Sequence, residues 1–509
     1  MKKTGLIIKK IKLSAILLCV SFAVFAACST GNNAWVGGGL YAPDALEGLG
    51  FYDRLNDETY SVINELPFVK TEDTAESYFS MDSHTAAYSN LRRMINNGQV
   101  INRNAIRTDE MLNYFSYSIP DSGETFSSVA KLTVAPWNSE NYFLSVGVRT
   151  RKTTIERYSQ GNNFVFLIDV SGSMSGENRL GLVKKSFLML LDNLNETDKI
   201  SIVTYANGVR TICSGVNAGN RSALEKKINA LVASGGTNGA GGIQAAYAAA
   251  ERNFIPGGNN RVLIATDGDF NVGLSSVDEL KEFIQEKAET GVYLTCLGYG
   301  MGNYRDDMLE TLARNGNGNF AYIDSLSEAK KVLVDEMDNA LCVVAKDVKS
   351  EITFNEDVVD SYRLIGYENK TITKEDFENE LTDAGELGSN TTAMVCYEIK
   401  LKQGAYPESV ASIRIKYKDP LTEENLEYSK SFVGIYSDIA QAGEDHRFAA
   451  AVVEFSLVIR NSAYMANASL RNVIETLDSL GCCSTNEYKA EFKELVVKVS
   501  KSDLIEKRE

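Results

Sequence analysis

Five oxygen-bearing side chains are the residues of this sequence whose types and spacing could hold a metal ion. They are Asp169, Ser171, Ser173, Thr237 and Asp267. The first three form a DxSxS pentapeptide directly after the apolar run 164–168, a pattern that by itself is equally typical of a polar turn. Together, three hydroxyls and two carboxylates form an all-oxygen set, which suits a hard cation better than a soft one. We therefore predict a Mg²⁺ site, with Mn²⁺ or Ca²⁺ as alternatives, whose open position accepts a partner's carboxylate.

The elements around these residues are expected to bring them to one edge of a sheet. Apolar strand patterns alternate with amphipathic helix patterns from residue 164 to residue 341. Strands are predicted at 164–168, 199–206, 261–266, 292–300 and 320–324, and helices at 186–194, 221–232, 243–254, 276–290, 305–314 and 327–341. Such alternation predicts an α/β fold with a doubly wound parallel sheet. In these folds ligands bind beyond the carboxyl ends of the strands, where all five residues are placed.

Residues 161–345 resemble a von Willebrand factor type A (VWA) domain, because DxSxS, the loop threonine and the TDG aspartate match its metal-ion-dependent adhesion site in order and spacing. The resemblance implies that Ser171, Ser173 and Thr237 contact the metal directly. It also implies that Asp169 and Asp267 act mainly through water and hydrogen bonds. Asp269 has no settled role in the pattern. In related domains the final helix moves on ligand binding, so helix 327–341 is expected to transmit such a shift.

The flanking regions resemble the accessory regions of bacterial VWA lipoproteins, so that the resemblance spans about residues 76–500. In the N-terminal accessory region, 76–160, two short helices at 84–97 and 104–115 should precede two strands. Five alternating segments in 346–437 predict a β-sandwich, and 438–509 has the periodicity of a helical bundle. Because a lone hairpin is marginal in water, we expect 126–150 to pair with 346–435, with the VWA domain inserted between them.

The first 27 residues are predicted to be a lipoprotein signal peptide. A lysine-rich start precedes the apolar stretch 13–25, which is too short for a stable membrane span. The following Phe-Ala-Ala-Cys resembles a lipoprotein processing site, which would make Cys28 the lipidated first residue. A plain secretory signal cleaved near Ala27 is the alternative. Residues 28–75 are interpreted as a tether and linker between the lipid anchor and the folded part of the protein. We therefore expect the protein to be attached to a membrane of the bacterial envelope, on the periplasmic or the cell-surface face.

The charge of the chain limits the kind of partner. Its formal net charge is −16, and without the first 27 residues 47 basic residues oppose 68 acidic ones, a net −21. Such a surface argues against nucleic acid as a partner. The predicted partner is a protein that offers Asp or Glu, and the sequence does not determine the oligomeric state.

Cysteine and histidine usage gives little support to catalysis. The six cysteines beyond Cys28 could form disulfides in an exported protein, but buried free thiols are at least as well supported, since Cys296 and Cys396 lie in apolar strands. The two histidines, His84 and His446, lie near predicted helix starts and are expected to be solvated. The sequence contains no HExxH motif, GxSxG motif or complete P-loop.

The sequence therefore predicts a membrane-anchored, non-enzymatic protein that captures an acidic side chain through Mg²⁺. One alternative is a structural scaffold of an envelope complex in which the metal has only a structural role. Another is a Mg²⁺-dependent phosphohydrolase with Asp169 as nucleophile. That class usually carries a second aspartate two residues on, where this chain has Ser171.

Overall fold

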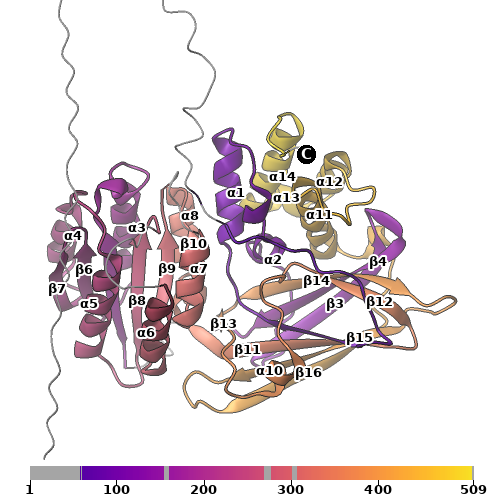
Figure 1. The fold of residues 1–509 in the computed structure, drawn as a ribbon, viewed down its shortest axis with the longest axis horizontal. Coiled ribbons are helices and arrows are strands. Elements are labelled where there is room, and N and C mark those ends of the chain that lie inside the picture. Colours follow the sequence, from indigo (N-terminus) through magenta and orange to yellow (C-terminus); the bar gives the residue numbers. More distant parts are fainter. Residues whose placement is uncertain (1–57, 59, 154–159, 269–276, 301–305, 507–509) are drawn as a thin grey trace, which may run out of the picture. The chain divides into compact units, whose positions relative to one another are not determined.

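The central sheet lies in residues 161–345, called the A domain below, and has the strand order β10–β9–β8–β5–β6–β7 (Figure 1). Its strands are β5 (Asn162–Asp169), β6 (Lys199–Tyr205), β7 (Val209–Asn217), β8 (Asn259–Thr266), β9 (Val292–Gly298) and β10 (Phe320–Tyr322). All neighbours pair in parallel except β6 and β7. The predicted parallel sheet is confirmed, whereas β7 was not predicted. This edge strand is only half-buried and carries no apolar run that would reveal it.

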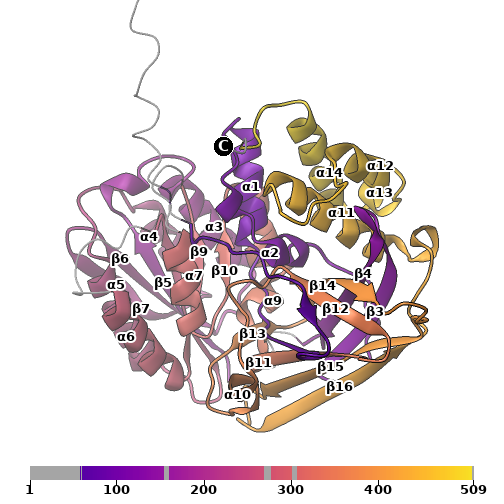
Figure 2. The same ribbon diagram turned by 45° about the vertical axis from the view of Figure 1, so that its right-hand side comes forward.

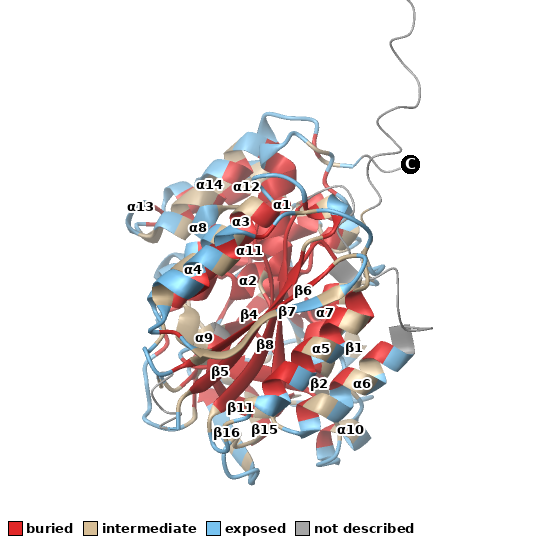
Figure 3. Ribbon diagram, turned by 90° about the vertical axis from the view of Figure 1, so that its left-hand side faces the viewer, coloured by how far each residue is buried: buried red, intermediate tan, exposed pale blue. Residues whose placement is uncertain are grey.

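Helices cover both faces of this sheet, as expected for a doubly wound fold. They are α3 (Leu180–Asp192), α4 (Arg221–Asn229), α5 (Gly239–Arg252), α6 (Val277–Glu289) and α7 (Asp306–Asn315). Side chains alternate along β5, so Phe164 and Phe166 pack toward α3 and α4, while Val165 and Leu167 pack toward α5, α6 and α7. Figure 3 shows the strands buried between helices whose outer faces are exposed.

The structure is a computed structural model that describes residues 58, 60–153, 160–268, 277–300 and 306–506. The predicted signal peptide, Cys28, most of the predicted linker and Asp269 lie outside these residues. Residues 52–509 cluster as one compact unit. No helix in the part of the chain that the structure describes combines the length and apolar composition needed to cross a membrane.

Strands from both sides of the A domain form a β-sandwich. One sheet has the order β1–β12–β14–β4–β3, and the other has the order β13–β11–β15–β16, with β2 also paired to β11. The strands are β1 (Val69–Lys70), β2 (Glu76–Ser80), β3 (Phe126–Ala135), β4 (Asn138–Thr150), β11 (Val343–Phe354), β12 (Val359–Ile365), β13 (Gly385–Gly388), β14 (Thr392–Leu401), β15 (Ser409–Lys418) and β16 (Asn425–Val433). Because β4 pairs with β14 in register Arg149–Thr392, the A domain is inserted into the sandwich, as the strand patterns predict.

The end of the predicted linker differs from the structure. Within the range 28–75, β1 pairs with β12 through Val69 and Tyr362, so the sandwich begins before residue 76. Next, β2 adds a strand to β11, in a region where we expected helices first. Short edge strands such as β1 derive their order from backbone pairing, so their side chains carry little signal in the sequence.

The helices before the A domain pack with those at the C-terminus in one hydrophobic cluster (Figure 2). These helices are α1 (Ala86–Asn96), α2 (Thr108–Asn113), α11 (Glu444–Ile459), α12 (Leu470–Asp478), α13 (Cys482–Thr485) and α14 (Glu487–Ser500), with the 3₁₀ turn η1 (Arg103–Ala105) between the first two. The N-terminal accessory region is thus divided, because its helices join the C-terminal helices and its strands join the sandwich.

The last helix of the A domain is broken rather than continuous. Instead of one helix over 327–341, the structure has α8 (Leu326–Lys330), a π-helical turn η4 (Lys331–Asp335) and the short α9 (Met337–Leu341). Outside the A domain, the short helix α10 (Lys374–Glu378) lies between β12 and β13, and the 3₁₀ turn η5 (Ile439–Gln441) precedes α11. The wide turn places Lys331 against Tyr114, with its ammonium 4.4 Å from the ring centre, and lets it pair with Glu336 at 2.6 Å. Contacts with the accessory helices therefore shape this part of the A domain.

A buried arginine connects the accessory helices to the A domain. Arg92 on α1 pairs with Asp324 at 2.5 Å, with Glu328 on α8 at 2.7 Å and with Glu491 on α14 at 2.9 Å. Arg92 and Glu328 are both almost fully buried. One cation thus neutralises carboxylates from two parts of the fold.

Candidate metal centre

The carboxyl end of β5 fixes Asp169 between two neighbouring segments. Its Oδ1 accepts the backbone N–H of Ser171 at 2.8 Å, and its Oδ2 accepts the hydroxyl of Thr266 at 3.1 Å. Thr266 ends β8, the strand beside β5. The carboxylate is fully buried, so its position is set by these donors and not by solvent.

The two serines of the DxSxS segment present their hydroxyls together. The Oγ atoms of Ser171 and Ser173 lie 2.9 Å apart, because the 3₁₀ turn η3 (Gly172–Met174) folds the chain back within two residues. Ser171 is buried and Ser173 is half-buried. A Cβ on Gly172 would lie 3.2 Å from the carbonyl oxygen of Gly235, so glycine permits the close approach of the next loop.

The loop that carries Thr237, between α4 and α5, lies against the DxSxS segment. Backbone N–H groups join the two loops, from Ser234 to the Val170 carbonyl at 2.7 Å and from Gly172 to the Gly235 carbonyl at 2.8 Å. The N–H of Asn238 donates to the Ala206 carbonyl beyond β6 at 2.8 Å. These bonds hold the half-buried Thr237 at the same edge of the sheet as the serines.

Asp267 follows β8 and is fully buried. Burial, together with the charge of Asp267, raises the pKa of Asp169 to about 6. Two buried carboxylates at one edge create a negative charge that a cation would offset. The donors are all hydroxyl or carboxylate oxygens, so the residues present fit Mg²⁺ and do not fit a soft metal.

The structure adds neighbours that the sequence did not single out. Thr266 binds Asp169, the side chain of Asn207 accepts the N–H of Gly236, and Arg179 donates to the carbonyl oxygen of Ser173. Thr266 belongs to the TDG motif and could have been found by its position. The sequence does not reveal Asn207 and Arg179, because only the folded chain brings them into contact with Gly236 and Ser173.

Both histidines are buried, so the expectation that they are solvated is wrong. Ser145 and Thr133 contact the two ring nitrogens of His446 at 2.7 and 3.0 Å, and burial lowers the pKa of His446 to about 3. His84 is likewise enclosed, 3.6 Å from Asp82. Tertiary packing encloses both rings, because His446 lies against β3 and β4 of the sandwich and His84 lies against Phe320 of β10.

His84 also belongs to a trio of possible ligands with Glu110 and Glu310, whose ligand atoms lie within 4.8 Å of one another. However, Arg107 pairs with Glu110 at 2.5 Å, and Arg314 pairs with Glu310 at 2.8 Å. The protein's own cations already neutralise these carboxylates, so we interpret the trio as part of an internal ion-pair network.

The six cysteines in the described part of the chain are free thiols. Cys296 and Cys396 are fully buried, and burial raises the pKa of both thiols. Such thiols pack as small apolar side chains and are poor nucleophiles.

Comparisons with known proteins agree with the VWA resemblance. Three families match in turn, described as von Willebrand factor over residues 54–145, von Willebrand factor type A domain over 163–336, and Uncharacterized protein YfbK, C-terminal, over 339–502. Uncharacterized protein YfbK of Escherichia coli (strain K12) is 34% identical over 466 residues, which cover 86% of this chain and 80% of that protein.

Other similarities are more limited. Inter-alpha-trypsin inhibitor heavy chain H3 of Mesocricetus auratus is 29% identical over 164 residues, 31% of this chain and 18% of that protein. The solved structure of a von Willebrand factor type A protein from Catenulispora acidiphila is 13% identical, covers 77% of this chain and 100% of that chain, and has a TM-score of 0.45. The extent of the YfbK match is decisive: this chain belongs to the YfbK family of proteins with a von Willebrand factor type A domain.

Proposed function

We propose that this protein is a membrane-anchored, non-enzymatic binding protein that captures an acidic side chain of a protein partner through Mg²⁺. The observation that carries the proposal is the 2.9 Å approach of the Ser171 and Ser173 hydroxyls directly after the buried Asp169 carboxylate, which accepts the Ser171 N–H at the carboxyl edge of the sheet. Thr237 and Asp267 complete the proposed ligand set.

The recognition step follows from the charge of these donors. Ser171, Ser173 and Thr237 are neutral, so a Mg²⁺ ion held by them remains electrophilic and favours an incoming Asp or Glu carboxylate as a ligand. Asp169 keeps its orientation through the Thr266 hydroxyl and the Ser171 N–H. The residues at this edge thus bind and orient, and the proposal requires no proton transfer.

The metal-binding part of the proposal is tested by calorimetry with MgCl₂. Asp169→Ala should abolish binding, because the variant loses the carboxylate that the Ser171 N–H and the Thr266 hydroxyl hold in place. Asp192→Ala, which removes an exposed carboxylate of α3, serves as a control and should bind as the parent does. Unchanged Mg²⁺ affinity in Asp169→Ala would refute the site.

Partner capture is tested with the full chain as bait in envelope extract. A protein retained with Mg²⁺ and released by a chelator supports adhesion through the metal. Retention that persists with chelator and in Asp169→Ala would instead indicate a scaffold role. For the anchor, Cys28→Ser should move the protein from the membrane fraction to the soluble fraction.

A further inference from the structure

A buried lysine lies between two aspartates where three segments of the chain meet. Lys370, in the loop after β12, places its Nζ 2.7 Å from Oδ2 of Asp109 on α2 and 2.8 Å from Oδ1 of Asp82, which follows β2. The side chains of Lys370 and Asp109 are each 1% exposed, and that of Asp82 is 6% exposed. The proposed adhesion function uses none of the three.

The backbone fixes the three residues in contact. The carbonyl of Lys370 accepts the N–H of Ser80 at 2.8 Å, and Ser80 lies two positions before Asp82. On the other side, a Cβ on Gly366 would lie only 2.7 Å from the backbone nitrogen of Asp109, so glycine lets this loop approach α2 closely. Contacts on both sides therefore hold the Lys370 ammonium group against the Asp109 carboxylate.

The two aspartates differ in how well their charges are compensated. Asp82 accepts the backbone N–H of His84 at 3.2 Å as well as the Lys370 ammonium, and its second oxygen lies 3.6 Å from the His84 ring. Burial opposes the ionisation of Asp82, but His84 and Lys370 lower its pKa below the usual range. Asp109 pairs with Lys370 alone among the described residues, and its Oδ1 is buried without a hydrogen-bond partner. Asp82 therefore stays a carboxylate, whereas the charge of Asp109 depends on Lys370.

One ammonium group is shared by these two carboxylates. Burial by itself lowers the pKa of Lys370, and the charges of Asp109 and Asp82 raise it above the usual value, so the proton is held by the same acids that could accept it. Two more buried carboxylates nearby have arginines of their own, in the pairs Arg107–Glu110 and Arg314–Glu310. Ionised groups are costly to bury, and joining Lys370 to Asp109 as a neutral amide would remove two of them.

We propose that Lys370 and Asp109 condense to an isopeptide bond, a covalent cross-link between the loop after β12 and α2. The geometry suits the reaction, because Nζ is at most about 4 Å from Cγ of Asp109 when the C–O bond is about 1.2 Å long. Reacting groups that the fold already holds together need little further ordering. The bond would close a loop of 261 positions that contains the whole A domain.

The step balances without any other reactant. Asp82 takes a proton from the Lys370 ammonium and passes it to the Asp109 carboxylate, so that a free amine faces a neutral carboxyl group. The amine lone pair attacks Cγ and the N–C bond forms. One C–O bond of Asp109 then breaks, and the second proton lost by the nitrogen reaches the departing oxygen by the same route. The products are one amide and one water molecule.

The test is peptide mapping by mass spectrometry, with the full chain denatured and digested with trypsin. The expected product is a branched peptide in which residues 108–131 are joined to residues 364–374, with the summed mass of the two peptides less one water. Trypsin should not cut after Lys370, because its ammonium group has become an amide. Recovery of only the separate peptides 108–131 and 364–370 would overturn the proposal.

The same map identifies the acceptor. A branch that joins 364–374 to the peptide 71–92 would make Asp82 the acceptor and would overturn the assignment to Asp109. Since the map is read from the parent protein, it stands even where a variant fails to fold.

Two variants separate the covalent bond from the ion pairs. Lys370→Arg keeps a positive charge between the aspartates, but its guanidinium group stays protonated and does not attack a carboxyl group. On a reducing, denaturing gel the parent should migrate faster than Lys370→Arg, because a closed loop keeps the denatured chain compact. Equal migration of the two proteins would overturn the proposal. Asp82→Asn cannot relay protons and should lower the cross-linked fraction by about ten-fold or more, and an unchanged fraction would overturn the role of Asp82.

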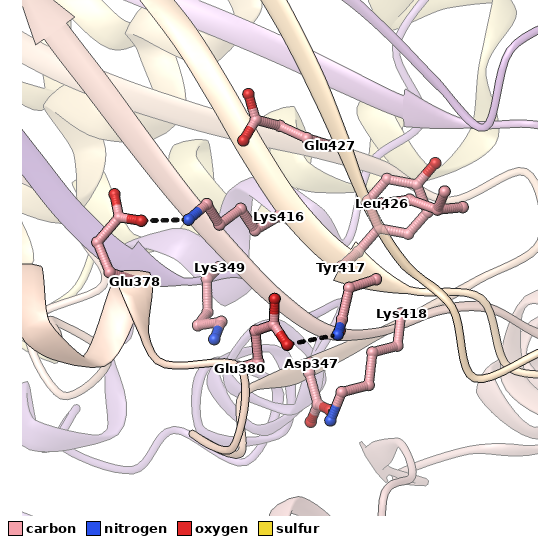
Figure 4. A pocket seen from close by; sticks show the side chains of 10 residues that line it. Asp347, Lys349, Glu378, Glu380, Lys416, Tyr417, Lys418, Leu426 and Glu427 are labelled. Carbon is pink, nitrogen blue, oxygen red and sulfur yellow. Dashed lines mark hydrogen bonds and ion pairs between the residues drawn. The ribbon is translucent and has the colours of Figure 1, made fainter.

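A second lysine–aspartate pair is an internal control in the same digest. Lys418 and Asp347 also pair at 2.7 Å, but their side chains are 23% and 11% exposed. Figure 4 shows Lys418 beside Asp347 in a hollow on the surface of the sandwich. Water stabilises the charged forms of this pair, so trypsin should cut after Lys418. Cross-linking at both pairs would indicate an artefact of sample preparation and would overturn the proposal.

Discussion

Buried carboxylates occur both in the A domain and in the sandwich, but in different surroundings. At the carboxyl end, Asp169 receives a hydroxyl and a backbone N–H, and serine hydroxyls lie beside it. In the sandwich, Glu386 on β13 is 5% exposed, and neither of its carboxylate oxygens has a hydrogen-bond partner. The comparison teaches that burial of a carboxylate does not by itself make a metal site, because a small hard cation needs the fixed oxygen donors that surround Asp169 and that Glu386 lacks.

A third group of carboxylates shows what happens when the protein supplies its own cation. Arg92 pairs with Asp324, Glu328 and Glu491 from within the fold. These carboxylates have a structural role, and the protein itself supplies the cation that pairs with them. Asp169 and Glu386 differ from this group, because among the described residues neither forms an ion pair with a cationic side chain.

The largest effect is expected at this internally neutralised group. Arg92→Met leaves buried carboxylates unpaired and should lower the free energy of unfolding by about 3–5 kcal/mol in a urea titration. Arg471→Met breaks an exposed pair with Glu475 and should change it by about 0.5 kcal/mol or less. A small effect of Arg92→Met would show that this network does not differ from the surface pairs.

The next largest effect is expected on Mg²⁺ affinity, which should respond to Asp267 and not to Glu386. Asp267→Asn removes a buried charge at the carboxyl end and should weaken Mg²⁺ binding by about 10- to 100-fold in calorimetry. Glu386→Gln replaces the buried carboxyl group of β13 and should leave Mg²⁺ affinity unchanged. If the two variants lose Mg²⁺ affinity equally, the surroundings of Asp267 and Glu386 do not determine where Mg²⁺ binds.

The pH dependence of stability should reveal the uncompensated Glu386. Its pKa is raised in the folded state, where Asp347, Asp383, Lys346 and Tyr293 surround it. Above the unfolded-state pKa of about 4.3, only the unfolded chain releases this proton, so stability falls as pH rises. Relative to Glu386→Gln, the parent should lose at most about 1.4 kcal/mol per pH unit between pH 5 and its folded pKa. Parallel stability curves for the two proteins would contradict this.

The smallest effect concerns the loop that holds Thr237. The Asn238 side chain accepts the Gly241 N–H at 3.1 Å and caps α5. Asn238→Ala should lower the unfolding free energy by about 1 kcal/mol. Asn238→Ser, which restores a capping oxygen, should recover most of that loss in the same denaturation experiment.

The sequence predicted the elements that carry strong periodicity. The apolar alternation of 164–341 predicted the parallel sheet and its helices, and the DxSxS, Thr237 and Asp267 spacing placed five oxygen donors at one edge, where the structure also places them. The inserted topology followed from the marginal stability of an isolated hairpin, and the β4–β14 pairing agrees with it.

What the sequence could not predict depends on distant contacts. Asp347 and Glu386 are brought together by an irregular register between β11 and β13, and no spacing along the chain reveals it. The burial of His446 depends on strands β3 and β4, more than 290 residues earlier. The break at Lys331 follows from the Tyr114 ring of another segment. In each case tertiary packing, not local propensity, determined the outcome.

The insertion of the A domain also sets an order of biosynthesis. Arg149 and its strand partner Thr392 are 243 positions apart. At the usual pace of translation, of about 5–20 residues per second, β4 is made roughly 10–50 s before β14 exists. The A domain is complete within that interval and can fold first, while the hairpin of β3 and β4 still exposes the edge that β14 will cover. The nascent chain therefore carries an open sheet edge for that time, and such an edge is a site where wrong strand pairing and aggregation can begin during synthesis.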